Sequence, residues 1–380
     1  MRHLLVTNDF PPKVGGIQSY LWELWRRLEP DDVCVLTTPY RGAAEWDAGQ
    51  PYRIERTRDP VLFPHPLLAR HITHLAAEHR AEVVLLDPAL PLGALVGPLR
   101  RSTGVPVGIV LHGAEITVPG RLPGSSQLLR HVLRCADFVV AAGGYPLAEA
   151  ERVAGRSLDS MVIPPGVDTD RFVPLDDAAR CSARTRLGLP VDAAVVVSVS
   201  RLVPRKGMDV LIRAVGRLRP SHPDLVLAIA GTGRDEARLR RLAEPLGDAV
   251  RFLGRVSDDD LPPLNAGADV WAMLCRDRWG GLEQEGFGIV FLEAAATGVA
   301  QVAGRSGGSH EAVVDGETGL IVADPTDVDQ VVAALERLLD SRELRSSMGA
   351  ADRRRAVDEF SYDLLADRLG EGLQRVAARA

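Results

Sequence analysis

The stretch HLLVTNDFPPKVGGIQSYLWEL, residues 3–24, passes from a short apolar run through a proline pair and two glycines into a helical pattern. The apolar residues of the run are continuous rather than alternating, which is typical of a parallel strand covered on both faces. The glycine pair predicts a tight turn, after which a helix begins near Gln18. A strand, a turn and a helix in this order open a βαβ unit, so the stretch indicates an α/β fold.

The same alternation continues along the whole chain. Apolar runs predict further buried strands in the first half at 32–38, 82–87, 107–113, 138–142 and 161–166. A second series predicts strands at 195–200, 225–231, 250–254, 269–274 and 299–304. Amphipathic helical patterns lie between the runs. We therefore expect two Rossmann-like, doubly wound α/β domains that face each other across a cleft.

A stretch rich in Pro, Gly and Asp, PPGVDTDRFVP at 164–174, separates the two series. We expect an N-terminal domain over residues 1–166 and a C-terminal domain over 167–361. The amphipathic tail at 362–380 predicts a terminal helix that crosses back to the first domain.

Composition narrows the class of protein. The formal net charge of −6 argues against a nucleic-acid partner. The four cysteines lie far apart without metal-ligand spacing, which predicts reduced, buried thiols and argues against a structural zinc site. Neither a signal peptide nor an apolar run long enough to span a membrane is recognisable, so we expect a cytoplasmic protein.

The first candidate site is the glycine turn at Gly15–Gly16. Glycines allow close approach of a ligand, and the first N–H groups of a helix can bind an anion, so a phosphate site is one interpretation. A plain strand-to-helix turn is the other. The turn is not GxGxxG, so the dinucleotide fingerprint of a dehydrogenase is absent here.

The second candidate is SRLVPRKG, residues 200–207, directly after a predicted strand. The chain has only two lysines among its 45 basic residues, and one of them is Lys206. A compact ammonium and a guanidinium are suited to different phosphate contacts, so Arg201 and Lys206 could clamp a diphosphate. A solvated basic loop is the alternative.

The third candidate, EQEGFGIVFLEAAATG at 283–298, is the most specific. Glu285 and Glu293 are eight residues apart, with Gly286 and Gly288 between them. Two such carboxylates can accept hydrogen bonds from the hydroxyls of a sugar and of a ribose. A plain helix with an acidic start is the alternative, but Glu293 lies within an apolar run, where a carboxylate needs partners.

Two further motifs lie at predicted strand ends. LHGAE at 111–115 places His112 at the end of a strand of the first domain. SGGSHE at 306–311 supplies a second glycine pair, with His310 and Glu311 as weaker candidates. Each motif alone is also compatible with a purely structural role.

Together and in this order, the motifs resemble those of the family 4 retaining glycosyltransferases, which have the GT-B architecture. The resemblance covers nearly the whole chain. Within the family, VTNDFPP, PPGVDTDRF, SRLVPRKG, EGFGIVFLEA and SGGSHEAV are most similar to the GDP-mannose-dependent mannosyltransferases of phosphatidylinositol mannoside synthesis.

The resemblance implies transfer of a hexose, most closely mannose, from a nucleoside-diphosphate sugar, most closely GDP-mannose. The acceptor would be phosphatidylinositol monomannoside or a related glycolipid at the inner membrane surface, which would make the protein peripheral there. The implied catalytic residues are His112, Arg201, Lys206 and Glu285. The implied donor-binding residues are Gly15, Gly16, Arg201, Lys206, Gly254, Arg255, Val256, Glu285, Gly286, Phe287, Gly288, Ile289, Val290 and Glu293. Acceptor contacts are expected from Asn8, Asp9, Gln18 and His112.

In this scheme Arg201 and Lys206 neutralise the leaving diphosphate, so no metal is expected as a cofactor. Glu285 holds the hydroxyls of the transferred sugar, Glu293 the ribose diol, and His112 the sugar near its C6. The backbone at 254–256 would form the base pocket.

The chain departs from the family pattern in several places. Ala114 stands where a second histidine is expected, and SGGSHE, GVAQVAG and AAGGYPLAEA are imperfect matches. Other donors such as UDP-glucose, a soluble sugar or inositol acceptor, and a protein without catalytic activity therefore stay open. A nucleotide-linked dehydrogenase is the remaining alternative.

Overall fold

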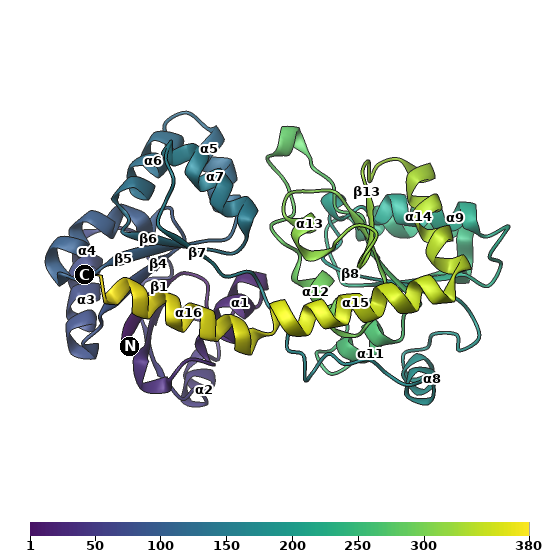
Figure 1. Ribbon diagram of the computed structural model, residues 1–380, viewed down its shortest axis with the longest axis horizontal. Helices are drawn as coiled ribbons and strands as arrows, with labels where there is room; N and C mark the ends of the chain where they lie inside the picture. The colour runs from purple at the N-terminus through teal and green to yellow at the C-terminus, as the bar shows by residue number, and fades with distance from the viewer. Residues whose placement is uncertain (380) are drawn as a thin grey trace. The chain divides into compact units, whose positions relative to one another are not determined.

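The computed structural model describes residues 1–379, and residue contacts divide the chain into two compact units. Unit 1 comprises residues 1–165 and the segment from Tyr362 onward, and unit 2 comprises residues 166–361. The chain therefore ends in the unit in which it begins (Figure 1).

Unit 1 is built on a seven-stranded parallel sheet with the order β3-β2-β1-β4-β5-β6-β7. The strand order reverses between β1 and β4, as in a doubly wound fold. The strands are β1 (His3–Thr7), β2 (Val33–Thr37), β3 (Arg53–Arg56), β4 (Val83–Asp87), β5 (Val107–Leu111), β6 (Phe138–Ala141) and β7 (Ser160–Val162).

Helices cover both faces of this sheet. They are α1 (Gly16–Trp25), η1 (Pro30–Asp32), α2 (Ala43–Ala48), α3 (Pro66–His79), η2 (Leu92–Leu95), α4 (Val96–Thr103), α5 (Ala114–Arg121), α6 (Ser125–Cys135), α7 (Gly144–Ala154) and α16 (Tyr362–Ala377). Buried residues of α3, α4, α6 and α7 form one core cluster with the inner strands. The terminal helix α16 packs against α1 and contacts β4.

Unit 2 repeats the design with a six-stranded parallel sheet, in the order β10-β9-β8-β11-β12-β13. Its strands are β8 (Val195–Val199), β9 (Val226–Ala230), β10 (Val250–Gly254), β11 (Val270–Met273), β12 (Gln301–Gly304) and β13 (Gly319–Val322). The order reverses between β8 and β11. The two doubly wound sheets predicted from the strand rhythm are confirmed.

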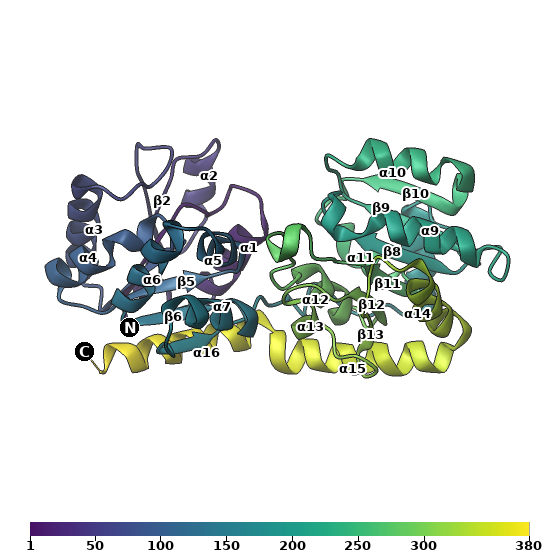
Figure 2. The same ribbon diagram turned by 90° about the horizontal axis from the view of Figure 1, so that it is seen from above.

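The helices of unit 2 form two layers around the sheet (Figure 2). They are α8 (Asp177–Arg186), η3 (Pro204–Lys206), α9 (Met208–Leu218), α10 (Glu236–Ala243), η4 (Glu244–Ala249), α11 (Leu261–Ala266), η5 (Trp279–Gly281), α12 (Ile289–Ala296), α13 (Ser309–Ala312), α14 (Val328–Asp340) and α15 (Arg342–Phe360). Buried residues of α9, α10 and α14 line one face of the sheet, and those of α11 and α12 line the other.

Three strands differ from the prediction. The edge strand β3 has the sequence RIER and is partly exposed, so it lacks the apolar run that marks buried strands. β13 is short and follows a glycine turn, and its apolar run GLIV was not singled out. β7, expected to be buried, is an edge strand with exposed residues at both ends.

The expectation of buried thiols is wrong for two of the four cysteines. Cys34 and Cys275 are buried, whereas Cys135 is half-buried on α6 and Cys181 is exposed on α8. The helical face that carries Cys181 points to solvent, which composition alone does not indicate. Across residues 1–379, none of the helices combines the length and the apolar character needed to cross a bilayer.

Candidate active site

The carboxyl end of β8 is the centre of the candidate site in unit 2. It lies beside β11, where the strand order reverses and where ligands of doubly wound sheets bind. After β8 the chain makes the short helix η3 and turns at Gly207 into α9. A Cβ on Gly207 would lie 2.0 Å from the carbonyl oxygen of Leu274, so only glycine allows this approach to the end of β11.

This turn places Lys206 against Glu285. The Lys206 Nζ donates to Glu285 Oε2 at 2.7 Å, and Arg205 donates to the same oxygen at 2.6 Å. Lys206 and Glu285 are only 6% and 7% exposed. The thiol of Cys275, which follows β11, lies 3.3 Å from that oxygen and donates to it. Two cations and a thiol thus converge on one carboxylate oxygen.

The cations determine the protonation state of Glu285. Burial alone would raise its pKa, but Lys206 and Arg205 lower the pKa to about 2. The pKa of the Cys275 thiol is raised by burial and by Glu285, so the thiol stays protonated and can donate. Glu285 is therefore a carboxylate at every physiological pH, which suits an acceptor of sugar hydroxyls.

The motif SGGSHE fixes the backbone of Glu285. The Glu285 N–H donates to Ser306 Oγ at 3.1 Å, and the Gly308 N–H donates to the Glu285 carbonyl at 3.0 Å. A Cβ on Gly308 would lie 2.1 Å from the Gly286 carbonyl oxygen. The motif contacts Glu285 through its serine and glycines, whereas His310 is exposed.

Glu293 lies on α12 and has a different environment. Its Oε2 is buried and has no hydrogen-bond partner within residues 1–379. Burial raises the pKa of Glu293 to about 7, although Arg171 opposes the shift. The two glutamates of the motif therefore differ in charge state: Glu285 is paired and ionised, and Glu293 is unpaired and titrates near neutrality.

The loop between the two glutamates leads into α12. Gly288, with φ +89°, is the N-cap residue of α12. It has no side chain, so no N-cap side chain accepts a hydrogen bond from the first N–H groups of the helix, which include those of Ile289 and Val290. The carbonyl oxygen of Gly286 packs closely against Gly308. The side chain of Phe287 is buried against Phe360, with 5.7 Å between ring centroids.

The other predicted donor residues lie at neighbouring strand ends. Arg201 is exposed directly after β8, and its side chain has no hydrogen bond or ion pair among the described residues. Gly254 ends β10, and its carbonyl accepts from the Gly231 N–H at 2.6 Å after β9. Arg255 is exposed and Val256 half-buried beyond it. The structure thus does not bring Arg201 into the Lys206–Glu285 cluster.

In unit 1, His112 follows β5 and contacts Asp87 at the end of β4. The distance from His112 Nε2 to Asp87 Oδ1 is 2.7 Å, and Thr7 Oγ1 donates to Asp87 Oδ2 at 2.6 Å. Burial alone would lower the pKa of His112, but Asp87 raises it above its usual value. Tyr20 packs edge-on against the imidazole, with 5.5 Å between ring centroids.

The remaining predicted residues of unit 1 have structural partners. Asn8 donates to the Leu62 carbonyl and accepts from the Leu62 N–H at 2.7 Å, so it fixes the loop before α3. Asp9 accepts from Lys13 and from Gln18, both at 2.6 Å. Gly15 and Gly16 form the start of α1, and a Cβ on Gly15 would lie 2.2 Å from Gln18 Oε1.

Sequence reasoning missed three residues of these clusters. Arg205 stands next to Lys206 in the quoted motif, Asp87 ends the predicted strand 82–87, and Cys275 directly follows the predicted strand 269–274. Their common signal is a polar side chain or thiol at the carboxyl end of a buried strand or in the loop that follows.

Two family models match the chain. One, described as "Glycosyltransferase Family 4", matches residues 14–171, and the other, "Glycosyl transferases group 1", matches residues 181–355. The first match covers most of unit 1 and the second covers most of unit 2.

Curated relatives match over nearly their full length. A GDP-mannose-dependent alpha-(1-6)-phosphatidylinositol monomannoside mannosyltransferase of Mycolicibacterium smegmatis is 44% identical over 375 residues, which is 97% of each chain. A GDP-mannose-dependent monoacylated alpha-(1-6)-phosphatidylinositol monomannoside mannosyltransferase of Corynebacterium glutamicum is 37% identical over 98% of this chain and 97% of its own.

Among solved structures, Anabaena HepE in complex with UDP superposes with a TM-score of 0.84. It is 20% identical, and the match covers 99% of this chain and 100% of that one. At this identity the likeness shows the fold alone.

Proposed function

The chain belongs to the family 4 retaining glycosyltransferases of GT-B architecture, and we propose that it transfers mannose from GDP-mannose to a phosphatidylinositol monomannoside. Donor and acceptor are those that the names of the M. smegmatis and C. glutamicum relatives give. The observation in the structure that supports the donor chemistry best is the convergence of Lys206 and Arg205 on Glu285.

In the reaction, the bond between the sugar C1 and the diphosphate oxygen breaks, and a bond from C1 to an acceptor hydroxyl forms on the same face. The acceptor proton passes to the leaving diphosphate, which therefore needs cationic and N–H donors while negative charge develops on it. Lys206 carries three N–H donors and uses one on Glu285, so others stay available for a phosphate oxygen. Arg201 is exposed in the loop that follows β8, and it is proposed as the second cationic contact of the diphosphate.

Glu285 is proposed to hold the hydroxyls of the mannosyl group. Its Oε2 is held by the cations, and its Oε1 has no hydrogen-bond partner among the described residues. Because the pKa of Glu285 is about 2, this oxygen is ionised and accepts hydrogen bonds at neutral pH.

Glu293 is proposed to bind the ribose of the donor. A buried carboxylate oxygen without a partner costs free energy, and two ribose hydroxyls can supply the missing donors. The glycine-bounded start of α12 and the backbone at Gly254–Val256 are proposed to contact the diphosphate and the base.

In unit 1, His112 is proposed to contact the transferred sugar. Asp87 orients its imidazole and favours the protonated form, which can donate to a sugar hydroxyl. Asp9 and Gln18 are proposed as acceptor contacts, whereas the bonds of Asn8 to Leu62 favour a structural role for it.

A lipid acceptor requires contact with a membrane surface. Phe63 and Leu67, at the loop before α3 and at its start, are 61% and 69% exposed, and Val61 is exposed beside them. We propose that these three apolar side chains insert into the inner leaflet of the membrane and so make the protein a peripheral membrane protein. Replacing Phe63 and Leu67 with serine should weaken cosedimentation with anionic vesicles.

The direct test is incubation of the purified protein with GDP-mannose and phosphatidylinositol monomannoside, followed by mass spectrometry of the lipid. The expected product is heavier by one hexose. A panel with UDP-glucose as donor and a soluble inositol as acceptor covers the alternatives, and no transfer from GDP-mannose to the lipid would overturn the proposal.

A further inference from the structure

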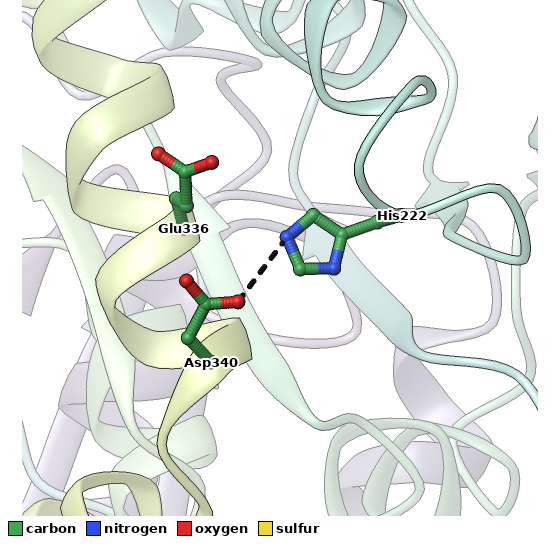
Figure 3. Close-up of side chains that lie close together, drawn as sticks. All are labelled: His222, Glu336 and Asp340. Atoms are coloured by element: carbon green, nitrogen blue, oxygen red, sulfur yellow. Dashed lines mark ion pairs between the residues drawn. The ribbon is translucent and has the colours of Figure 1, made fainter.

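His222, Glu336 and Asp340 bring three metal-ligating side chains together on the surface of unit 2 (Figure 3). One ligand atom from each residue lies within 4.8 Å of the other two. His222 belongs to the turn between α9 and β9, and the two carboxylates lie on α14. In Figure 3 the imidazole points from the turn towards the carboxylates of the helix.

Both backbones that carry the cluster are firmly held. The His222 N–H donates to the Leu218 carbonyl at 2.8 Å, and the His222 carbonyl accepts from the Leu225 N–H at 3.1 Å. On α14, Leu335 and Leu338 are fully buried in the same core cluster as Leu218. The three side chains therefore start from fixed positions, as a metal site requires.

The electrostatics of the cluster favour a cation. Glu336 and Asp340 are spaced i, i+4 on one helix face, where two like charges destabilise a helix. Within residues 1–379, no Lys or Arg forms an ion pair with either carboxylate. The His222 Nε2 is buried, has no hydrogen-bond partner in the described part of the chain, and lies 3.5 Å from Asp340 Oδ1.

From this arrangement we infer that His222, Glu336 and Asp340 bind a divalent transition-metal ion, with Zn²⁺ as the best fit. One imidazole nitrogen and two carboxylates, with water in a fourth position, suit Zn²⁺, whereas Mg²⁺ prefers oxygen ligands alone. Ligands at about 2.1 Å from one ion lie at most about 4.2 Å apart, so a small side-chain rotation must close the site. Asp340, at the last residue of α14 and 63% exposed, is free to make it.

The site is separate from the proposed donor site. His222 precedes β9, at the amino end of the sheet, whereas Lys206 and Glu285 lie beyond the carboxyl ends of the strands. A bound ion would join the α9–β9 turn to the end of α14 and stabilise the fold of unit 2 by mass action. The inference thus goes beyond the proposed function and does not depend on it.

The test is a Zn²⁺ titration of chelator-treated protein against a chromophoric indicator, with thermal unfolding measured in parallel. We expect the wild-type protein to bind one more Zn²⁺ per chain than His222→Gln or Glu336→Gln, and Zn²⁺ to raise its unfolding temperature by several degrees. These variants should fold normally in chelator, since both residues are only half-buried.

The matched control is His74→Gln. His74 forms an exposed i, i+4 pair with Glu78 at 3.2 Å, and no third ligand within residues 1–379 completes a metal site there, so its loss should leave the Zn²⁺ stoichiometry unchanged. The close pair Cys135 and His131 is present in every variant and cancels in the comparison. Equal stoichiometry and equal thermal shifts in wild type, His222→Gln and Glu336→Gln would overturn the inference.

Discussion

Glu285 and Glu293 show how two identical side chains acquire different properties in one motif. Lys206 and Arg205 hold Glu285 as a carboxylate with a pKa of about 2, while burial without a partner raises the pKa of Glu293 to about 7. The first is suited to constant hydrogen bonding with sugar hydroxyls. The second is suited to a ligand that brings its own donors.

The position of Lys206 leads to the first prediction. Lys206→Ala should lower kcat/KM for nucleotide release from GDP-mannose about 100-fold to 1000-fold, because a preorganised donor to the leaving diphosphate is lost. Lys206→Arg should rescue only part of the loss, since a planar guanidinium cannot replace a compact ammonium in a buried position.

The control for this prediction is Arg217→Ala. Arg217 on α9 forms an exposed ion pair with Asp329 on α14, so its loss should leave nucleotide release unchanged. Unaltered turnover in Lys206→Ala would exclude Lys206 as a contact of the diphosphate.

Glu293 leads to a prediction on pH. Ribose hydroxyls bind the carboxylate better than the acid, so the affinity for GDP-mannose should rise about tenfold between about pH 6 and about pH 8. Glu293→Gln should bind more weakly at high pH and show no such rise, whereas Asp259→Asn, an exposed change, should keep it. Calorimetric titrations at several pH values measure both, and an unchanged pH profile in Glu293→Gln would refute the assignment.

The same group affects stability. Its folded pKa lies above the unfolded value of about 4.5, so the folded state binds more protons between these values. The contribution of Glu293 to the free energy of unfolding should therefore fall as pH rises from about 4.5 to about 7 and stay lower above it, by on the order of 3 kcal/mol. Glu293→Gln should remove this contribution and be more stable than the wild type at pH 8, as chemical unfolding at several pH values measures.

At the scale of elements, the turn between η3 and α9 positions the cations. Gly207 has φ +70°, and the Leu274 carbonyl occupies the position that a Cβ on this residue would need. The close packing of this turn against the end of β11 is what brings Lys206 to Glu285.

A pair of glycine substitutions tests this packing. Gly207→Ala should destabilise unit 2 by more than about 2 kcal/mol and disturb donor binding, because both φ and the contact with Leu274 oppose a Cβ. Gly316→Ala has a similar φ of +79° but open space around it, so it should cost only about 1 kcal/mol. Thermal unfolding measures the difference, and equal losses would show that backbone conformation alone explains Gly207.

The strands that are buried in the two sheets were predictable from the sequence. Continuous apolar runs located β1, β4, β5, β8, β9 and β11. β3 was missed because an edge strand needs no apolar face, and the exposure of β7 was missed because burial depends on the neighbours that a strand has in the sheet.

Within the site, the motifs could be located from sequence but the pairing between them could not. Lys206 and Glu285 were each identified, but as ligands of a donor rather than as partners of each other. Arg205 and Asp87 acquire their roles only when distant strand ends meet, which depends on strand order. The cluster of His222 with Glu336 and Asp340 has no sequence signature for the same reason.

At the scale of the whole molecule, the last helix returns to the first unit. α16 buries Leu365, Leu369 and Leu373, and its Asp363 forms an ion pair at 2.6 Å with Arg27, which follows the end of α1. Unit 1 is therefore completed by residues from both ends of the chain.

This arrangement predicts that the effect of a core substitution in α16 is confined to unit 1. Leu369→Ala should lower the stability of unit 1 by about 3 kcal/mol and accelerate hydrogen exchange in α1 and β1. Exchange in β8 to β13 and the affinity for GDP should stay as in the wild type. Arg368→Ala, at an exposed neighbouring position, is the control, and faster exchange in unit 2 would contradict the prediction.

The most direct test of the central claim is a crystal structure of the protein with a non-reactive analogue of GDP-mannose. The account predicts a phosphate oxygen within hydrogen-bond distance of Lys206 Nζ, a sugar hydroxyl on Glu285 and the ribose on Glu293. An analogue bound with its diphosphate away from the carboxyl end of β8 would contradict it.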